Sequence, residues 1–331
     1  MSVKYTTLIK FAATSLIATL ITGAGIIQPF INQYFPAQAQ SITPRLWGID
    51  EDDGQLFSFE DYTTLTGFQN YGQLKWDDNG TIRTVGQDIE AMTLDEDGTM
   101  YMALDRILGV DDNNGTYCAT VMSFNIQDAL LEGSGDNVVD ILGAIQIECN
   151  SEEDNVSGLS IDPLNGDLVA LLKDYNNGNN TVHDKLYKIS KTDGSLVQLI
   201  GSINGLGEHS LEAEDIEHAP DGTLYVTDSD DDETYKVDPS TGAIIEVIDQ
   251  SQDNGLAGVS GVKFEALGWD FGNNLLVGND DDNEIIAQLS LQEGNNLSYG
   301  DTNSLSLTDV EGIDFVPTLD GEPIVATPFA D

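Results

Sequence analysis

The chain has 331 residues, with 12 Lys plus Arg against 58 Asp plus Glu, a formal net charge of -46 and 40% hydrophobic residues. This hydrophobic content supports a globular core and excludes wholesale disorder despite the charge. A surface this acidic repels phosphate backbones and anionic lipids, so it excludes nucleic acid and anionic membrane surfaces as favoured partners. It attracts multivalent cations and cationic groups on a partner.

The N-terminal segment has the organisation of a secretory signal peptide. Two lysines precede an uncharged apolar run at 11–27, and Ala37-Gln38-Ala39 has the small-x-small pattern of a cleavage site. We expect removal of residues 1–39, which leaves 40–331 as one domain in a secreted, periplasmic or extracellular location. An uncleaved membrane anchor is the alternative, because the apolar run is near the shortest length that spans a bilayer.

The two cysteines lie in separate strand-like runs. Cys118 begins one apolar run and Cys149 ends the next. If these runs pair as an antiparallel hairpin, the two cysteines lie side by side, and an oxidising compartment allows them to form a disulfide. Such a bond would contribute ~3–4 kcal/mol in the loop-entropy model. Two separate buried thiols are the alternative.

A short pattern recurs along the chain at intervals of 43 to 67 residues. Most copies place Glu or Ser after a β-branched residue. The copies lie at 88–92, 155–159, 215–219, 258–262 and 309–313. Most are followed by a turn such as Asp97-Gly98, a short strand such as 100–103, and two further strands. Four strands in a repeat of this length are typical of a β-propeller blade.

We therefore predict an all-β protein, a single β-propeller of five four-stranded blades. The last copy lacks its following strands, whereas the domain begins in mid-blade with strands at 46–50 and 55–59. Joining the two chain ends in one blade closes the ring and removes an exposed sheet edge. A strand-like segment at 322–327 leaves six blades as an alternative. Beyond the signal we expect no helix except one turn near 128–132.

Acidic residues mark the start of most innermost strands. In a propeller these starts share a face with the loops between the second and third strands of each blade. The acids expected to surround one mouth of the central channel are Glu90, Glu217, Glu311, Asp88, Asp215 and Asp309. Clustered carboxylates repel one another unless a cation neutralises them, and calcium takes six to eight oxygen ligands. We predict Ca²⁺ at this mouth; the alternative is glutamates that are solvated or accept backbone N–H groups.

A second candidate for calcium is the acidic loop that carries Asp228, Asp230 and Asp232. Their alternating spacing is that of half an EF-hand loop, but the glycine and the distal glutamate of that motif are missing. A solvated acidic loop is the alternative. No histidine spacing matches a zinc pair, and neither a phosphate-binding loop nor a nucleophile elbow is present in the sequence.

The stretches 221–228 and 309–315 resemble a broad propeller group that includes NHL-repeat, SMP-30 (gluconolactonase-like), phytase-like and SdiA-regulated proteins. The resemblance implies the propeller fold. It also implies that a channel-facing glutamate of this type can hold a divalent metal, which supports Glu90, Glu217 and Glu311. The chain departs from the group in showing five copies rather than six, and in lacking the basic residues with which a phytase holds phosphate.

Two functions from different classes follow. The favoured hypothesis is an exported, calcium-binding module, expected to be monomeric, whose small-molecule, glycan or protein ligand the sequence does not identify. The alternative is a metal-dependent hydrolase, a lactonase or phosphoesterase, in which calcium activates a carbonyl or water and Asp215 or Glu214 acts as base. A glycosidase carboxylate pair, which needs a separation of roughly 5–9.5 Å, is a third and weaker hypothesis.

Overall fold

The structure is a computed structural model whose described residues all belong to one compact unit, 42–324. They are 45–51, 54–85, 89–104, 119–130, 137–145, 156–173, 184–204, 213–228, 233–249, 263–280, 284–291, 295–302, 305, 307 and 309–316. The predicted signal peptide, the predicted disulfide between Cys118 and Cys149, and the acids Asp88, Asp230 and Asp232 lie outside the described residues.

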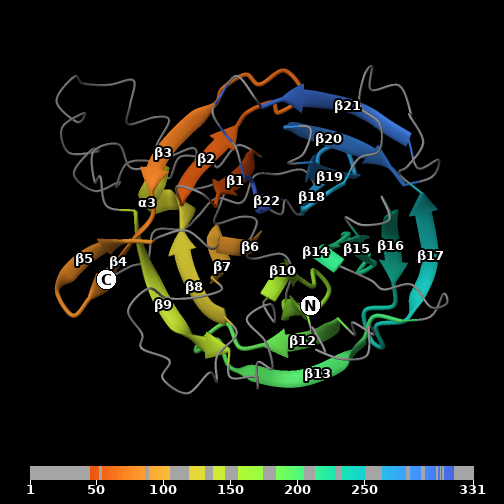
Figure 1. Ribbon diagram of the computed structural model, residues 1–331, viewed down its shortest axis with the longest axis horizontal. Helices are drawn as coiled ribbons and strands as arrows, with labels where there is room; N and C mark the ends of the chain where they lie inside the picture. Colours follow the sequence, from red (N-terminus) through yellow and green to blue (C-terminus); the bar gives the residue numbers. More distant parts are fainter. Residues whose placement is uncertain are drawn as a thin grey trace, which may run out of the picture. The chain divides into compact units, whose positions relative to one another are not determined.

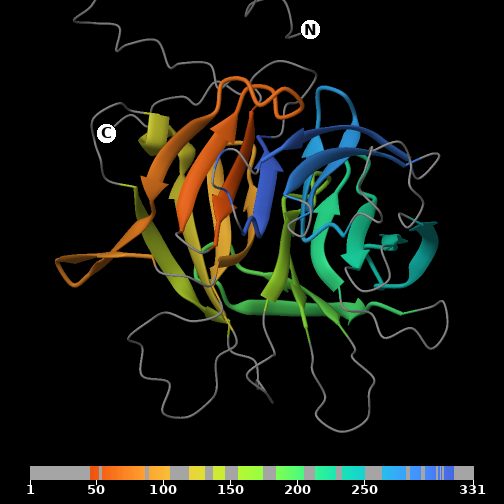
Figure 2. The same cartoon turned by 45° about the horizontal axis from the view of Figure 1, so that its top comes forward.

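Five sheets, numbered here as blades 1 to 5, are arranged around one axis (Figures 1 and 2). Blade 1 is β22 (Gly312–Phe315), β1 (Leu46–Asp50), β2 (Gln55–Phe59) and β3 (Gln69–Gln73). Blade 2 is β6 (Ile89–Leu94), β7 (Thr99–Leu104), β8 (Ala119–Asn125) and β9 (Val138–Ile145). Blade 3 is β10 (Val156–Ile161), β11 (Leu168–Leu172), β12 (Lys185–Ile189) and β13 (Leu196–Ser202). Blade 4 is β14 (Ala213–His218), β15 (Leu224–Asp228), β16 (Glu233–Val237) and β17 (Ile244–Asp249), and blade 5 is β18 (Ala266–Asp270), β19 (Leu275–Asp280), β20 (Ile285–Ser290) and β21 (Asn295–Asp301).

The innermost strands close a ring of five. Each contacts the next in the order β22, β6, β10, β14, β18 and back to β22. The two ends of the propeller meet in blade 1, where β22 pairs with β1 and Phe315 lies opposite Leu46. The predicted five blades and the closure by both chain ends are confirmed. Six blades is wrong, because the inner strands of five blades already complete the ring.

Blade 2 carries an addition that the sequence repeat does not predict. The hairpin of β4 (Lys75–Asp78) and β5 (Thr81–Thr84) joins the outer strand β9 in parallel, which makes this sheet six-stranded. Figure 1 shows the hairpin extending outward from the propeller. A short helix, α3 (Ile126–Leu130), lies close to the predicted single turn. Across the described parts of the chain, no helix has the length and apolarity to cross a membrane.

The same turn separates the first two strands of three blades. Gly98, Gly166 and Gly222 have φ of 80°, 74° and 83°, a region that glycine enters without steric cost. The residue ahead of each glycine caps the turn; for example, Asp97 Oδ1 accepts the N–H of Thr99 at 2.9 Å. This explains why the repeat is readable as Asp-Gly or Asn-Gly followed by a strand.

The core consists of five apolar clusters, each with residues from two neighbouring blades. Each cluster contains one residue from the middle of a different inner strand. These residues are Met92, Leu159, Ile216, Leu267 and Ile313. All five are almost fully buried. Because alternate residues on a strand face opposite sides, the residues next to these five turn toward the other side of their strand, and several of them are polar.

Candidate functional site

Strand register aligns the five inner strands residue by residue. Ala91, Gly158, Asp215, Ala266 and Gly312 occupy equivalent positions, one residue before the end of the second strand of the blade. We call the residues immediately before them the glutamate ring: Glu90, Ser157, Glu214, Glu265 and Glu311. In blades 2, 3 and 4 the ring residue falls in a β-bulge. Four of five blades therefore present a glutamate where the inner strand begins.

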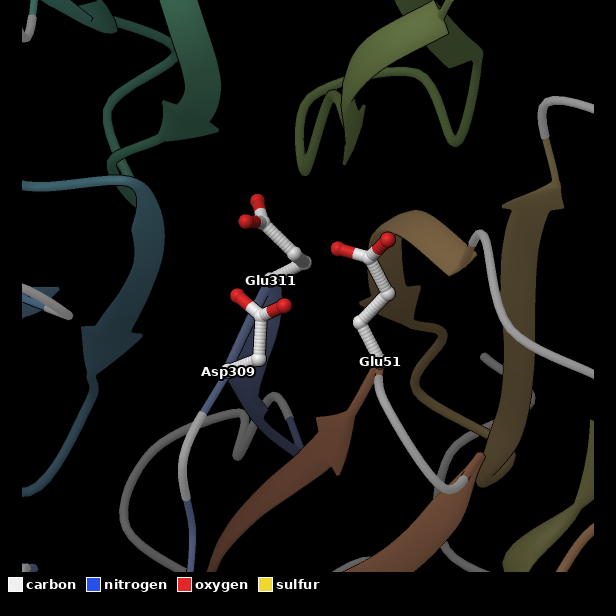
Figure 3. A group of neighbouring side chains, drawn as sticks. All are labelled: Glu51, Asp309 and Glu311. Carbon is white, nitrogen blue, oxygen red and sulfur yellow. The ribbon is translucent and has the colours of Figure 1, made fainter.

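A compact carboxylate group lies on the blade 1 side of this ring. Carboxylate oxygens of Glu51, Asp309 and Glu311 lie within 4.8 Å of one another, and all three side chains are partly buried. Figure 3 shows Glu51 extending from the end of β1 toward the two acids that precede β22. The N–H of Glu51 donates to the carbonyl of Asp309 at 2.7 Å, which holds the two chain ends together. We call these three residues the carboxylate triad.

Electrostatics at the triad favour a positive ligand. Burial raises the pKa of Glu311 well above its ordinary value, and the carboxylates of Glu51, Glu265, Glu90 and Asp309 raise it further. Every one of these influences penalises the charged form of Glu311. A cation among these oxygens would remove that penalty.

An amide oxygen beside the triad is also unsatisfied. Asn279 is 1% exposed, and its Nδ2 donates to the carbonyl of Val310, between Asp309 and Glu311, at 3.1 Å. Its Oδ1 is buried and has no hydrogen-bond partner among the described residues. A buried amide oxygen without a donor is costly, and it is a ligand that hard cations accept.

The predicted mouth residues divide into two levels. Glu90, Glu311 and Asp309 lie at the mouth, as expected. Glu217 lies deeper: it is opposite Tyr225, just as Asp314 is opposite Trp47, so its equivalent is Asp314 and not Glu311. Glu214, three residues earlier in the chain, takes the position equivalent to Glu311, so the sequence repeat in blade 4 is offset by three residues from the strand register.

Asp215 and Asp314 serve as acceptors for strand edges within the channel. Asp215 accepts the N–H of Leu267 at 2.6 Å and of Ile216 at 2.7 Å. Asp314 accepts the N–H of Leu94 at 2.7 Å and of Phe315 at 2.6 Å. Since Leu267 and Leu94 belong to neighbouring blades, these carboxylates connect inner strands. Asp215, predicted as a mouth acid, is therefore an acceptor for backbone N–H groups of two inner strands.

Burial keeps the interior acids readily protonated. It raises the pKa of Asp314 to about 7, even though the backbone N–H groups of Leu94 and Phe315 lower it. Burial also raises the pKa values of Asp215 and Glu217 well above their ordinary range. Asp215 and Asp314 already accept backbone N–H groups, which occupy the oxygens that an ion would need, so they are weaker ligand candidates than the triad.

The interior also contains a buried histidine. His218 is 2% exposed, and its Nδ1 lies 3.0 Å from the hydroxyl of Ser160, which in turn donates to Glu217 at 3.4 Å. Burial lowers the pKa of His218 to about 4. Ser160 is fully buried, so this arrangement is a satisfied core network and does not present a nucleophile.

Asp228, the described member of the predicted calcium loop, lies apart from the triad. It is 1% exposed at the end of β15, and the hydroxyl of Tyr235 donates to it at 3.4 Å. The fourth copy of the repeat, 258–262, lies outside the described residues, and the inner strand of that blade is β18, which begins later in the chain at Ala266. The ring residue of that blade is thus Glu265, which lies beyond the predicted copy. Glu51, which follows β1, was not among the residues selected from the sequence.

Comparisons with known proteins identify no family for this chain. No protein-family model matches the sequence, and no curated protein matches it. A protein of unknown function from Bacteroides caccae has 9% identity and a TM-score of 0.44, covering 79% of this chain and 74% of that one. The periplasmic gluconolactonase of Pseudomonas aeruginosa has 11% identity and a TM-score of 0.39, covering 78% and 68%. A streptogramin B lyase has 11% identity and a TM-score of 0.39, covering 81% and 70%. At these values the likeness carries no argument about activity.

Proposed function

We propose that the chain is an exported propeller that binds Ca²⁺ at the carboxylate triad and acts as a ligand-binding or protein-binding module. The observation that carries this proposal is the convergence of Glu51, Asp309 and Glu311 within 4.8 Å. Oxygens that share one Ca²⁺ at 2.3–2.6 Å lie at most about 5 Å apart, so the spacing suits a single ion.

The donor set also suits this ion chemically. Three carboxylates supply up to six oxygens, and Asn279, whose Oδ1 is unsatisfied, is bonded to the backbone between Asp309 and Glu311. Hard oxygen ligands of this kind select calcium or magnesium over the softer transition metals. Calcium accepts irregular coordination, which suits a site assembled from two chain ends, whereas magnesium demands a near-ideal octahedron.

A binding role is preferred to the hydrolase alternative because the two carboxylates that a hydrolase would use as bases are already engaged in other contacts. Asp215 is fully buried and accepts backbone N–H groups, and Glu214 forms an ion pair with Lys173. Neither carboxylate is placed to take a proton from water bound at the triad.

Export is the part of the proposal that rests on the sequence. The apolar run at 11–27 and the Ala37-Gln38-Ala39 motif support cleavage by a signal peptidase. Mass spectrometry of the protein recovered from the exported fraction should find Gln40 as the first residue. A chain that retains residue 1 in the membrane fraction would establish the anchor alternative.

The test is thermal unfolding of the purified protein in EDTA, in millimolar calcium and in millimolar magnesium. Calcium at 100 times its dissociation constant should raise the free energy of unfolding by ~2.7 kcal/mol, and magnesium should do less. The double substitution Glu51→Gln with Glu311→Gln should abolish the calcium effect. The matched control is Glu96→Gln with Glu246→Gln, which removes the same charge from exposed positions and should keep the effect. No calcium effect on the natural protein would refute the proposal.

A further inference from the structure

A lysine stands where the glutamate ring lacks its glutamate. Blade 3 contributes Ser157 to the ring, and Lys173 follows the second strand of the same blade. The ammonium of Lys173 forms an ion pair with Glu214 of blade 4, and the side chains of the two are only 15% and 18% exposed. Lys173 is also under the electrostatic influence of Glu90 of blade 2. It therefore interacts with both glutamates that flank Ser157.

The environment keeps this lysine charged. Burial lowers the pKa of Lys173, but the carboxylates of Glu214, Asp184 and Glu90 outweigh burial and leave that pKa above its ordinary value. An ammonium with three donors suits a gap between two carboxylates.

The equivalent position in blade 1 bears the opposite charge. Lys173 comes directly after Leu172, the last residue of β11, which lies opposite Val156. Glu51 comes directly after Asp50, the last residue of β1, and Asp50 is one residue beyond the Ile49–Gly312 pair. The register thus places Lys173 and Glu51 at the same point of their blades. One side of the ring has a built-in ammonium, and the other has the triad.

We propose that Lys173 is a specificity-determining residue that acts as an internal counter-cation, and so limits the ring to one divalent ion, held at the triad. This inference rests on the proposed function. Lys173 offsets one of the two negative charges of Glu214 and Glu90, so that side of the ring is left with one net negative charge, too little to hold a second divalent ion. Its positive charge also repels an ion placed on that side.

The first test counts ions by isothermal titration with calcium. The natural protein and Lys173→Arg should each bind one ion at the mouth, whereas Lys173→Met should bind two, because Glu214 and Glu90 lose their counter-charge. One ion with unchanged affinity in Lys173→Met would overturn the inference and leave the proposed function intact. No calcium binding by the natural protein would overturn both.

The second test does not depend on the folding of Lys173→Met. Glu51→Lys places an ammonium at the position equivalent to that of Lys173, and Glu51→Gln is its matched neutral control. Both variants should lose calcium binding. In EDTA, Glu51→Lys should have a Tm about 2 °C or more above that of Glu51→Gln, because the ammonium substitutes for the ion. An equal or lower Tm for Glu51→Lys would contradict the idea that a lysine at this position replaces a cation.

Discussion

The mouth of the channel and its interior both collect carboxylates on the same inner strands, but they neutralise them differently. Asp314 lies three residues beyond Glu311, and it accepts N–H groups from its own strand and from blade 2. Glu311 instead faces Glu51 and Asp309, and its strongest electrostatic neighbours are carboxylates. The interior acids are thus part of the folded framework, whereas the mouth acids Glu51, Asp309 and Glu311 lie close enough together to repel one another.

The difference between the two levels shows that carboxylates on the inner strands of a five-bladed propeller can satisfy backbone groups at strand edges. The innermost strand of each blade has an edge that faces the channel, and unpaired edge groups are costly unless something bonds to them. Asp215 and Asp314 satisfy such groups across blade boundaries. At the strand starts, neighbouring carboxylates raise the pKa of Glu311 in addition to burial, so charge repulsion is a main influence on that group.

The largest expected effect is the loss of an interior acceptor. Asp314→Ala removes the acceptor for the N–H groups of Leu94 and Phe315 and for the hydroxyl of Thr93. Each buried donor left unsatisfied costs ~1–3 kcal/mol, so the free energy of unfolding should fall by more than ~3 kcal/mol. Urea unfolding in EDTA measures this. Asp309→Ala, the same substitution at the mouth, should cost less than ~1 kcal/mol; an equal loss in both variants would erase the contrast.

The interior acids should also give the protein without calcium an unusual dependence on pH. Burial raises the pKa of Asp314 to about 7, against 3.8 ordinarily, and raises that of Glu217. The folded protein therefore holds protons that the unfolded chain has released. The resulting stability is complete below about pH 4 and is lost as pH rises through 7.

His218 opposes this trend only at lower pH. Because burial lowers its pKa from 6.5 to about 4, its contribution is lost as pH falls between these values. From pH 6.5 to 8.5 the carboxyls act alone, so the free energy of unfolding in EDTA should fall by a few kcal/mol. Denaturant titrations at these two pH values test this. Glu217→Gln should flatten the dependence, and stability that rises over this range would contradict the assigned state of the interior acids.

Much of the fold could be predicted from the sequence because three of the five blades encode the same turn between their first two strands. The Asp-Gly and Asn-Gly pairs require a residue with positive φ, and the strand after each is apolar and β-branched or aromatic. The β4–β5 hairpin was not predictable in this way. It occurs once, and it joins blade 2 through a parallel pairing with β9, which leaves no repeat in the sequence.

The site was only partly predictable, because register decides which acids meet. Ile216-Glu217 matches Val310-Glu311 in sequence, but it matches Ile313-Asp314 equally well, and only the partners Tyr225 and Trp47 distinguish the two. The unsatisfied oxygen of Asn279 likewise follows from packing against Val310, a residue of another blade.

A smaller effect tests how closely the interior acids are packed. A Cβ added to Gly158 would lie 2.8 Å from Oδ1 of Asp215 and 2.8 Å from the backbone nitrogen of Ile216. Overpacking of this kind costs ~1–3 kcal/mol, so Gly158→Ala should lower the free energy of unfolding by about that amount. Gly272→Ala, whose added carbon lies 3.3 Å from Asp270, is the milder control. Equal stability of the two variants would mean that Asp215 has room to move.

The smallest effect has the opposite sign and concerns the mouth. Glu311→Gln keeps the shape of the side chain and removes its repulsion with Glu51 and Asp309. In EDTA at pH 8.5, where Glu311 is ionised to the greatest extent, the free energy of unfolding should rise by ~1 kcal/mol at low salt. The gain should shrink in 0.5 M salt, because screening weakens repulsion between partly exposed charges. It should also shrink as pH falls, because the raised pKa of Glu311 lets that carboxyl take up a proton at a higher pH than an ordinary glutamate does. A loss of stability in EDTA would show that the Glu311 carboxylate, like that of Asp314, is a structural acceptor, and the contrast between mouth and interior would then fail.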